Sequence, residues 1–165
     1  MPSATFPTAL GICALSWTED ALTGFSLPPL DAADASEVID TGKLPGWIAT
    51  LGKRVKAHLD GVYQDFGDVA YDFSRVTPFQ QEVYRAALRV SAGQVRTYGW
   101  LAEAIGRDRG ASRAIGGALG RNPWPLLVPC HRFVGADGRM TGFSASGGLE
   151  TKRRLLALEG AELAL

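Results

Sequence analysis

One short stretch of the chain places a nucleophile, a base and a cation side by side: Leu126-Leu127-Val128-Pro129-Cys130-His131-Arg132. The apolar residues before the proline can exclude water from the polar side chains that follow. A neighbouring imidazole or guanidinium favours the thiolate, the nucleophilic form of cysteine. The stretch indicates a reactive Cys130, with an inert buried cysteine as the alternative. Because neighbouring side chains on a strand point to opposite faces, a contact between Cys130 and His131 requires a turn or a bridging water.

Length and composition favour an ordinary globular protein. The chain has 165 residues, of which 46% are hydrophobic and 21% charged, enough for one domain or two small ones. No apolar run approaches the ~20 residues that span a bilayer, and no signal peptide is recognisable. The 2 cysteines do not make a disulfide framework. We therefore expect a cytoplasmic protein in a reducing compartment, with no membrane segment.

The formal net charge of +0 conceals an uneven distribution of charge. Acidic residues outnumber basic ones in residues 1–76, whereas basic residues, almost all arginine, predominate in residues 77–165. A basic half suggests an anionic partner, and arginine suits phosphates and base edges. Solvated surface charge is the alternative explanation.

The first half, residues 1–76, predicts a small α/β domain. Apolar residues recur with strand or helix spacing in four segments, at 11–17, 22–27, 47–59 and 69–73. The first two predict a hairpin, the third a helix and the fourth another strand. Residues 1–10 are expected to be frayed, and a short helix is expected near 34–39. Cys13 is interpreted as a core thiol, and His58 as a residue near the C-terminal end of a helix that is explained by the helix dipole or by contact with solvent.

The second half, residues 77–165, predicts a mostly helical domain. Thr77-Pro78 is a helix start, and Thr97 caps a helix over 98–105. A polar turn at 106–110 then leads to a helix over 111–119, which is a helix-turn-helix pattern. A hairpin is expected around 134–140, and a last helix over 150–159 is expected to bury Leu155 and Leu158 and expose its basic residues, Lys152, Arg153 and Arg154.

The helix over 111–119 has an unusual composition. It contains Gly116 and Gly117, and each glycine costs about 1 kcal/mol relative to alanine in a helix. Close approach of another backbone or of a ligand can offset this cost. Small residues surround a single long cation, Arg113, so the helix suits a narrow groove. The alternative is helix packing through glycine, with Arg113 merely exposed.

Several motifs of the second half occur together and in order: Thr97-Tyr98-Gly99, Ala111-Ser112-Arg113-Ala114-Ile115-Gly116-Gly117-Ala118, Asn122-Pro123, Pro129-Cys130-His131-Arg132, and the loop and helix ending at Glu159. In these motifs the chain resembles the O6-alkylguanine-DNA alkyltransferases, also called methylated-DNA–protein-cysteine methyltransferases. The resemblance covers slightly more than half of the chain. It implies a small α/β N-terminal domain at 1–76 and a helical C-terminal domain with a winged-helix or helix-turn-helix element at 77–165.

The resemblance implies a role for each matching catalytic residue. Cys130 accepts the alkyl group, and His131 acts on it through a water as a base. Glu159 orients the imidazole, Asn122 holds the turn before the cysteine, and Tyr98 donates a proton to the departing guanine.

The resemblance also implies a DNA surface and a base pocket. Arg113 enters the duplex where the damaged base leaves it. The remaining DNA-binding residues are Ala111, Ser112, Ala114, Gly116, Gly117 and Arg121. The pocket for the extruded base is lined by Val128, Pro125, Phe143 and Ser144. Phe143 stands where the family often has tyrosine, and the loop at 144–147 is longer than is typical.

The implied activity is irreversible transfer of an alkyl group from O6-alkylguanine, and from O4-alkylthymine, in double-stranded DNA to Cys130. The base is flipped out of the duplex first. Minor-groove binding, a monomer, a cytoplasmic or nucleoid location, no cofactor and no metal are implied as well. One alternative is a non-catalytic sensor of alkylated bases, although such relatives replace the cysteine. A cysteine hydrolase and a plain helix-turn-helix regulator are less consistent with the Cys130 segment.

Overall fold

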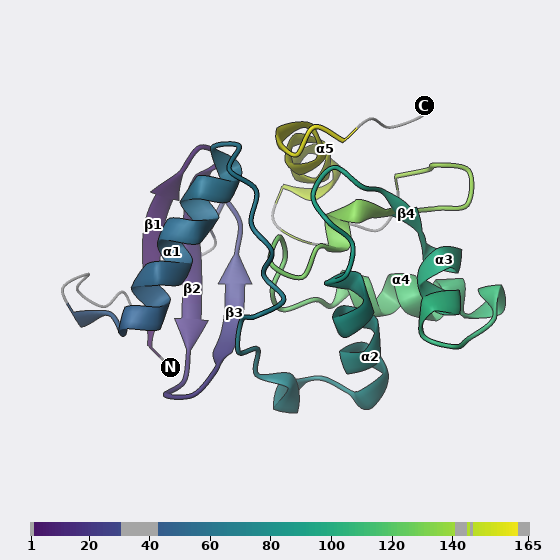
Figure 1. Cartoon of the computed structure of the whole chain (residues 1–165), viewed down its shortest axis with the longest axis horizontal. Coiled ribbons are helices and arrows are strands. Elements are labelled where there is room, and N and C mark those ends of the chain that lie inside the picture. Colours follow the sequence, from purple (N-terminus) through teal and green to yellow (C-terminus); the bar gives the residue numbers. More distant parts are fainter. Residues whose placement is uncertain (1, 31–42, 141–144, 146, 162–165) are drawn as a thin grey trace.

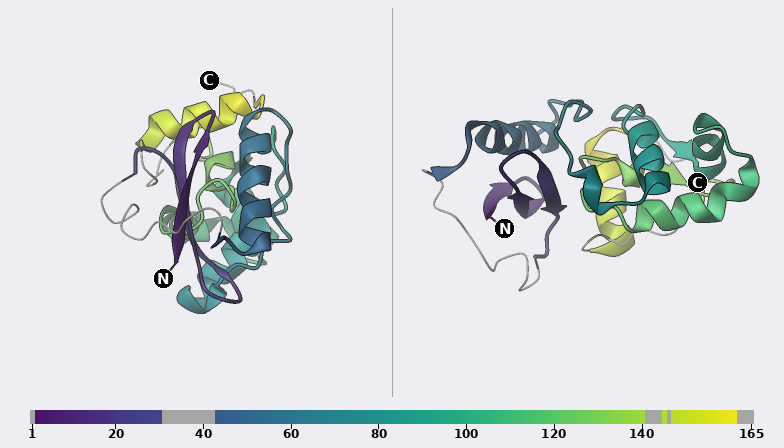
Figure 2. Two further views of the ribbon diagram at one scale, coloured as in Figure 1. Left: turned by 90° about the vertical axis from the view of Figure 1, so that its left-hand side faces the viewer. Right: turned by 90° about the horizontal axis from the view of Figure 1, so that it is seen from below.

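The computed structural model describes residues 2–30, 43–140, 145 and 147–161. It places a sheet with one covering helix beside a group of short helices (Figure 1). Seen from below, these two halves lie next to each other (Figure 2). The predicted α/β fold with a helical second half is confirmed. The helix expected near 34–39 lies outside the described residues.

The first half is built on a three-stranded antiparallel sheet in the order β1-β2-β3. Its strands are β1 (Ser3–Thr8), β2 (Gly11–Trp17) and β3 (Leu22–Ser26). Leu15 lies opposite Ala4 on one side and Phe25 on the other, and all three side chains are buried. The predicted hairpin is confirmed. The expectation of a frayed start is wrong, because residues 3–8 gain strand partners along β2 that their own sequence does not reveal.

Helix α1 (Gly46–Leu59) covers the sheet, as the left-hand view of Figure 2 shows. The residues predicted to face inward are buried, namely Ile48, Leu51, Val55 and Leu59. The strand expected at 69–73 is not formed. Tyr71 makes only an isolated bridge with Leu22, and a 3-10 turn, η2 (Phe73–Arg75), follows. The Asp72 side chain accepts a hydrogen bond from the Ser74 amide at 3.3 Å, which favours a turn over an extended strand.

The described part of the second half contains four α-helices, separated by turns and by a longer loop that carries Cys130. They are α2 (Pro78–Ala87), α3 (Tyr98–Ala104), α4 (Ser112–Gly120) and α5 (Gly148–Leu158). The side chains of Thr77 and Thr97 cap α2 and α3, as predicted, and Gln80 completes a capping box at the start of α2. The 3-10 turn η3 (Arg109–Ala111) connects α3 to α4 and completes the helix-turn-helix.

Two short strands differ from the predicted hairpin around 134–140. The turn is present, because the Gly135 amide donates to the Arg139 carbonyl at 2.8 Å. The strand partner is different: β5 (Phe133–Val134) pairs in parallel with β4 (Arg96–Thr97). This pairing ties the segment that follows the cysteine to the start of the helix-turn-helix.

Trp124 joins the two halves in one hydrophobic core. Its side chain is fully buried, and its Nε1 donates to the Leu22 carbonyl at 3.0 Å. The Phe25 amide of β3 donates to the Pro123 carbonyl at 3.0 Å. The Tyr71 ring lies 5.1 Å from the Trp124 ring, centroid to centroid. The sheet therefore packs directly on the loop that leads to Cys130.

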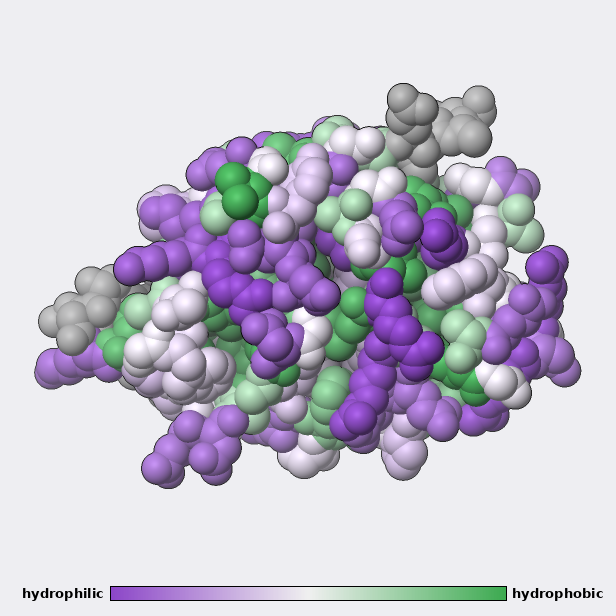
Figure 3. Space-filling model, in the orientation of Figure 1, coloured by the Kyte–Doolittle hydropathy of each residue, from purple (hydrophilic) through white to green (hydrophobic). Residues whose placement is uncertain are grey.

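Hydrophilic residues run across the face of the molecule in Figure 3, with small hydrophobic areas between them. The exposed large hydrophobic residues of the described chain are scattered, at Ile12, Val62, Tyr63, Trp100 and Leu149. Among the described residues, no helix combines the length and the apolar character needed to cross a membrane.

Candidate active site

Cys130 lies in a tight turn, one of the two arrangements that allow a contact between Cys130 and His131. The 3-10 turn η4 (Cys130–Arg132) follows Pro129 directly. Cys130 is 7% exposed and His131 is 0% exposed. The turn keeps both side chains within one buried site, as an extended strand would not.

Asn122 braces the loop that carries the cysteine. Its Nδ2 donates to the Val128 carbonyl at 2.8 Å, and its Oδ1 accepts from the Trp124 amide at 2.9 Å. Within this loop, Leu126 has a φ of 78°, a left-handed conformation that branched side chains rarely adopt. Strain of this kind persists only where the surrounding contacts enforce it. The two Asn122 bonds and the burial of Leu126 supply such contacts.

Glu159, at the C-terminal cap of α5, is the centre of a buried polar network. Its Oε1 accepts from His131 Nε2 and from Arg132 Nε, each at 2.9 Å. Its Oε2 accepts from Arg132 Nη2 at 2.6 Å and lies 2.8 Å from His58 Nε2. Burial alone would raise the pKa of Glu159, but the electrostatic interaction with His131 and the hydrogen bonds from Arg132, His131 and His58 outweigh it and lower the pKa. The carboxylate is therefore ionised and can only accept hydrogen bonds.

This network fixes the orientation of the His131 ring. Because Glu159 can only accept, His131 Nε2 carries the proton and donates to it. Nδ1 then presents a lone pair, and this buried atom has no hydrogen-bond partner among the described residues. Burial, opposed in part by Glu159, lowers the pKa of His131 and keeps the ring neutral. A neutral imidazole with a free lone pair is suited to act as a base.

The surroundings of the Cys130 thiol shift its pKa in opposite directions. Burial raises its pKa, whereas a hydrogen bond from Asn122 and the charge of Lys152 lower it. Lys152 is 0% exposed, and its Nζ donates to the Phe133 carbonyl at 2.7 Å. Burial in turn lowers the pKa of Lys152 to about 8. The expectation that Lys152 faces water is therefore wrong: it shares a helix face with Leu155, Leu156 and Glu159.

Of the two explanations offered for His58, contact with solvent is wrong. Its side chain is 1% exposed rather than in contact with solvent. It belongs to α1 in the first half, and its Nε2 reaches Glu159 Oε2 in the second. The available signal was spacing, because His58 follows Val55 by three residues on the buried face of α1.

Helix α4 presents the small residues and the cation that the sequence singled out. Arg113, Ala114, Gly117 and the following Arg121 are exposed, and Ala111, Ser112 and Gly116 are half-buried. A Cβ atom added to Gly116 or Gly117 would meet no atom within 4 Å in the described structure, so helix packing does not explain these glycines. Arg113 has no ion pair or hydrogen bond among the described residues.

The remaining site residues are placed only in part. Tyr98 begins α3 and, with Thr97 and Ser112, lines a pocket beside the start of α4. Pro125 and Val128 are buried and form a bridge within the cysteine loop. Phe143 and Ser144 lie outside the described residues. Within the described chain, no group of three or more metal-ligating side chains could hold a metal ion.

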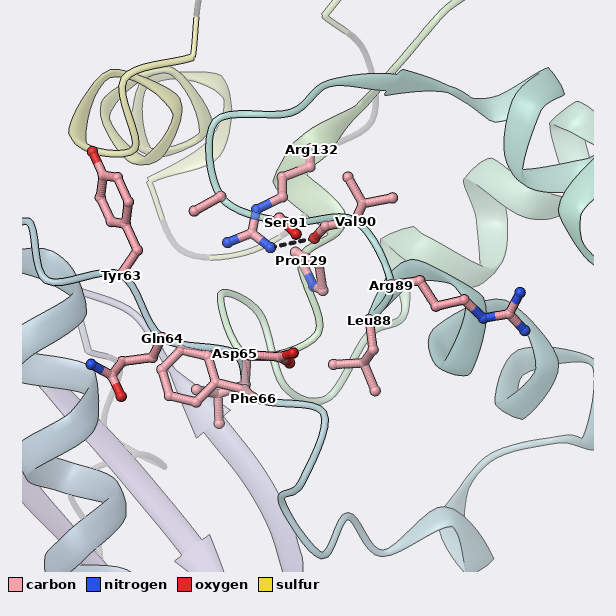
Figure 4. A pocket seen from close by; sticks show the side chains of 12 residues that line it. Tyr63, Gln64, Asp65, Phe66, Leu88, Arg89, Val90, Ser91, Pro129 and Arg132 are labelled. Carbon is pink, nitrogen blue, oxygen red and sulfur yellow. Dashed lines mark hydrogen bonds between the residues drawn. The ribbon is translucent and has the colours of Figure 1, made fainter.

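A second pocket, of about 270 Å³, lies behind the cysteine segment (Figure 4). The loop at 63–66 of the first half and the loop at 88–92 of the second half form its sides, and Pro129 and Arg132 lie in its wall. Arg132 Nη1 donates to the Val90 carbonyl at 2.6 Å. The pocket thus borders the polar network from the side of the first half.

A helix-turn-helix domain with a buried cysteine, backed by a histidine and a carboxylate, defines a class of DNA-binding protein with a reactive thiol. Residues 78–161 match the family model described as 6-O-methylguanine DNA methyltransferase, DNA binding domain. A curated methylated-DNA–protein-cysteine methyltransferase of Mycobacterium tuberculosis is 44% identical over 115 residues, 70% of this chain and 67% of the relative. One of Mycolicibacterium paratuberculosis is 36% identical over 155 residues, 94% of this chain and 90% of the relative.

Solved structures agree with these relatives. A crystal structure of Mycobacterium tuberculosis OGT in complex with DNA has a TM-score of 0.81 at 34% identity and covers 97% of this chain and 93% of its own. The O6-methylguanine-DNA methyltransferase of Pyrococcus kodakaraensis has a TM-score of 0.66 at 30% identity. The match covers 97% of this chain and 99% of the Pyrococcus chain. The chain belongs to the methylated-DNA–protein-cysteine methyltransferase family.

Proposed function

We propose that the protein repairs DNA by moving the alkyl group of O6-alkylguanine, and of O4-alkylthymine, irreversibly to Cys130. The observation that carries the proposal is the free lone pair of His131 Nδ1 beside a buried cysteine, with Nε2 held by Glu159. Retention of Cys130 separates the chain from non-catalytic sensors of alkylated bases, which replace this residue.

The chemistry follows from these groups. A water between His131 Nδ1 and the Cys130 thiol carries the thiol proton to the imidazole, and the thiolate attacks the alkyl carbon in line. The bond from carbon to guanine O6 breaks, and the guanine takes up a proton from Tyr98. The proton held by His131 then returns to the Tyr98 phenolate through water, so both side chains regain their neutral forms. The products are a thioether and an unmodified guanine, so no redox partner is consumed. Because the thioether has no good leaving group, each protein molecule reacts once.

The substrate must be brought to a thiol that is 7% exposed. Extruding a base from a duplex requires a few kcal/mol. Arg113 on α4 would occupy the vacated space, while the small residues of that helix allow close approach to the minor groove. Binding of DNA by the relative in the mycobacterial crystal structure supports this partner. We further propose a monomer in the cytoplasm, or associated with the nucleoid in a bacterium, with domains at 1–76 and 77–165.

The two cysteines provide a matched test. Cys130→Ala is expected to abolish alkyl transfer from a methylated duplex while preserving its binding. Cys13→Ala, in the sheet of the first half, is expected to react as the parent does. Radiolabelled methyl transfer and gel-shift binding measure the two properties. Transfer retained by Cys130→Ala would contradict the proposal.

A further inference from the structure

His58 is the one residue of the first half that a recorded hydrogen bond connects to Glu159 in the described structure. It lies near the end of α1, 101 residues before Glu159 in the sequence. The two side chains are each 1% exposed, and His58 Nε2 lies 2.8 Å from Glu159 Oε2. A hydrogen bond that is this short and shielded from solvent is stronger than one exposed to water.

The protonated nitrogen of His58 can be assigned from its partners. The Gln64 amide donates to His58 Nδ1 at 3.0 Å, so Nδ1 is an acceptor. Nε2 must then carry a hydrogen and donate to the carboxylate. Both nitrogens are therefore used, and the ring orientation is fixed from two sides.

The two histidines are arranged symmetrically around Glu159. Glu159 Oε1 accepts hydrogen bonds from His131 Nε2 and Arg132 Nε. Glu159 Oε2 accepts them from His58 Nε2 and Arg132 Nη2. Without His58, Oε2 would keep only the arginine bond. The carboxylate would then be held by Arg132 and His131 alone, and its alignment with the His131 ring would loosen.

We propose that His58 is a positioning residue for alkyl transfer, through which the first half of the chain holds Glu159 against His131 and so keeps His131 Nδ1 directed toward Cys130. The proposal rests on the proposed function, because it concerns the reactivity of that same cysteine. It gives the sheet half a chemical contribution besides its packing on Trp124.

The surroundings of His58 hold it in place. The Tyr63 and Phe66 rings lie 5.7 Å and 5.5 Å from its ring, centroid to centroid. Tyr63 points toward α5 (Figure 4), and its hydroxyl donates to the Leu158 carbonyl at 2.9 Å. Tyr63 therefore contacts the same end of α5 without touching the carboxylate, which makes it a suitable control.

Three variants separate positioning from packing. His58→Asn keeps an acceptor near the Gln64 amide, but its shorter side chain does not reach Glu159. His58→Gln places an amide donor where Nε2 lies. Tyr63→Phe removes a different bond between the first half and α5. The measurements are the rate constant of alkylation by a duplex containing O6-methylguanine and by free O6-benzylguanine, binding of methylated duplex by gel shift, and melting temperature.

We expect His58→Asn to react roughly tenfold more slowly with both substrates, as for loss of one hydrogen bond to a charged group. Binding of DNA should be unchanged. His58→Gln should recover most of the rate, and Tyr63→Phe should match the parent. The proposal is overturned if His58→Asn reacts at the parental rate, or if His58→Gln is no faster than His58→Asn. A parent that fails to react would instead refute the proposed function.

Discussion

Replacing Gly117 by alanine should stabilise the fold and weaken binding to DNA. Gly117 is exposed within α4, and a Cβ atom there would meet no atom within 4 Å. Alanine is favoured over glycine inside a helix by about 1 kcal/mol. With no clash to offset this gain, the free energy of unfolding should rise by about that amount, which corresponds to an increase in melting temperature of about 2–4 °C.

The effect on DNA binding should have the opposite sign. If α4 approaches the groove closely, the added methyl group must displace DNA or helix, and overpacking of this kind costs about 1–3 kcal/mol. The dissociation constant for duplex DNA should therefore rise by about fivefold or more. Calorimetry and fluorescence anisotropy measure the two quantities on the same preparation.

Gly52 in α1 provides the matched control. A Cβ atom there also meets nothing within 4 Å, but the residue lies on the sheet half. Gly52→Ala should raise the melting temperature similarly and leave DNA affinity unchanged. If Gly117→Ala bound DNA as tightly as the parent, the inference that this glycine permits close approach would be refuted.

Three further substitutions test the site. Arg113→Ala should reduce repair of duplex DNA far more than reaction with a free alkylated guanine; equal losses in the two rate constants would exclude insertion into the duplex. Lys152→Met should slow alkylation by about tenfold at pH 7, as for one pKa unit at the thiol. Because the pKa of Lys152 is about 8, the difference from the parent should shrink above that pH, which a pH series of rates measures. Glu159→Gln should lower the free energy of unfolding by about 3 kcal/mol at pH 7, because Arg132 would remain buried without its partner, and it should also slow alkylation. The pKa of Glu159 lies below its usual 4.5 in the folded protein, so this contribution to stability is present above that pH and declines below it. Denaturation at pH 7 and pH 4 should show that the free energies of unfolding of the parent and of Glu159→Gln lie closer together at pH 4. An equal difference at the two pH values would contradict an ionised Glu159 that stabilises the fold.

The helix-turn-helix was predictable because its signals are local. The Thr77 and Thr97 caps, the polar turn and the apolar spacing of α3 and α4 all lie within a few residues of the structure they specify. Strand geometry indicated that a contact between Cys130 and His131 needs a turn or a bridging water, and the structure contains the turn. The two glycines of α4 were recognised as unusual, and the structure removes helix packing as their explanation.

The wrong predictions share a different cause: each concerns residues whose structure depends on partners that are distant in the sequence. Residues 3–8 form a strand only because β2 supplies the neighbouring edge. Charged or polar side chains near a helix end usually contact solvent, and this general tendency fails for His58 and Lys152. Each is instead satisfied by a group far along the chain, Glu159 for His58 and the Phe133 carbonyl for Lys152. Helical spacing marks both side chains as inward-facing, and for these two residues it predicts burial better than polarity does.

The central claim is that the Cys130 sulfur permanently takes an alkyl carbon from a base in DNA. The direct measurement is intact mass of the protein after incubation with excess duplex containing O6-methylguanine, followed by peptide mapping. We expect a gain of one methyl group per chain, about 14 mass units, at Cys130 and none at Cys13, with no further gain on longer incubation. An unchanged mass, or a methyl group located elsewhere, would contradict it.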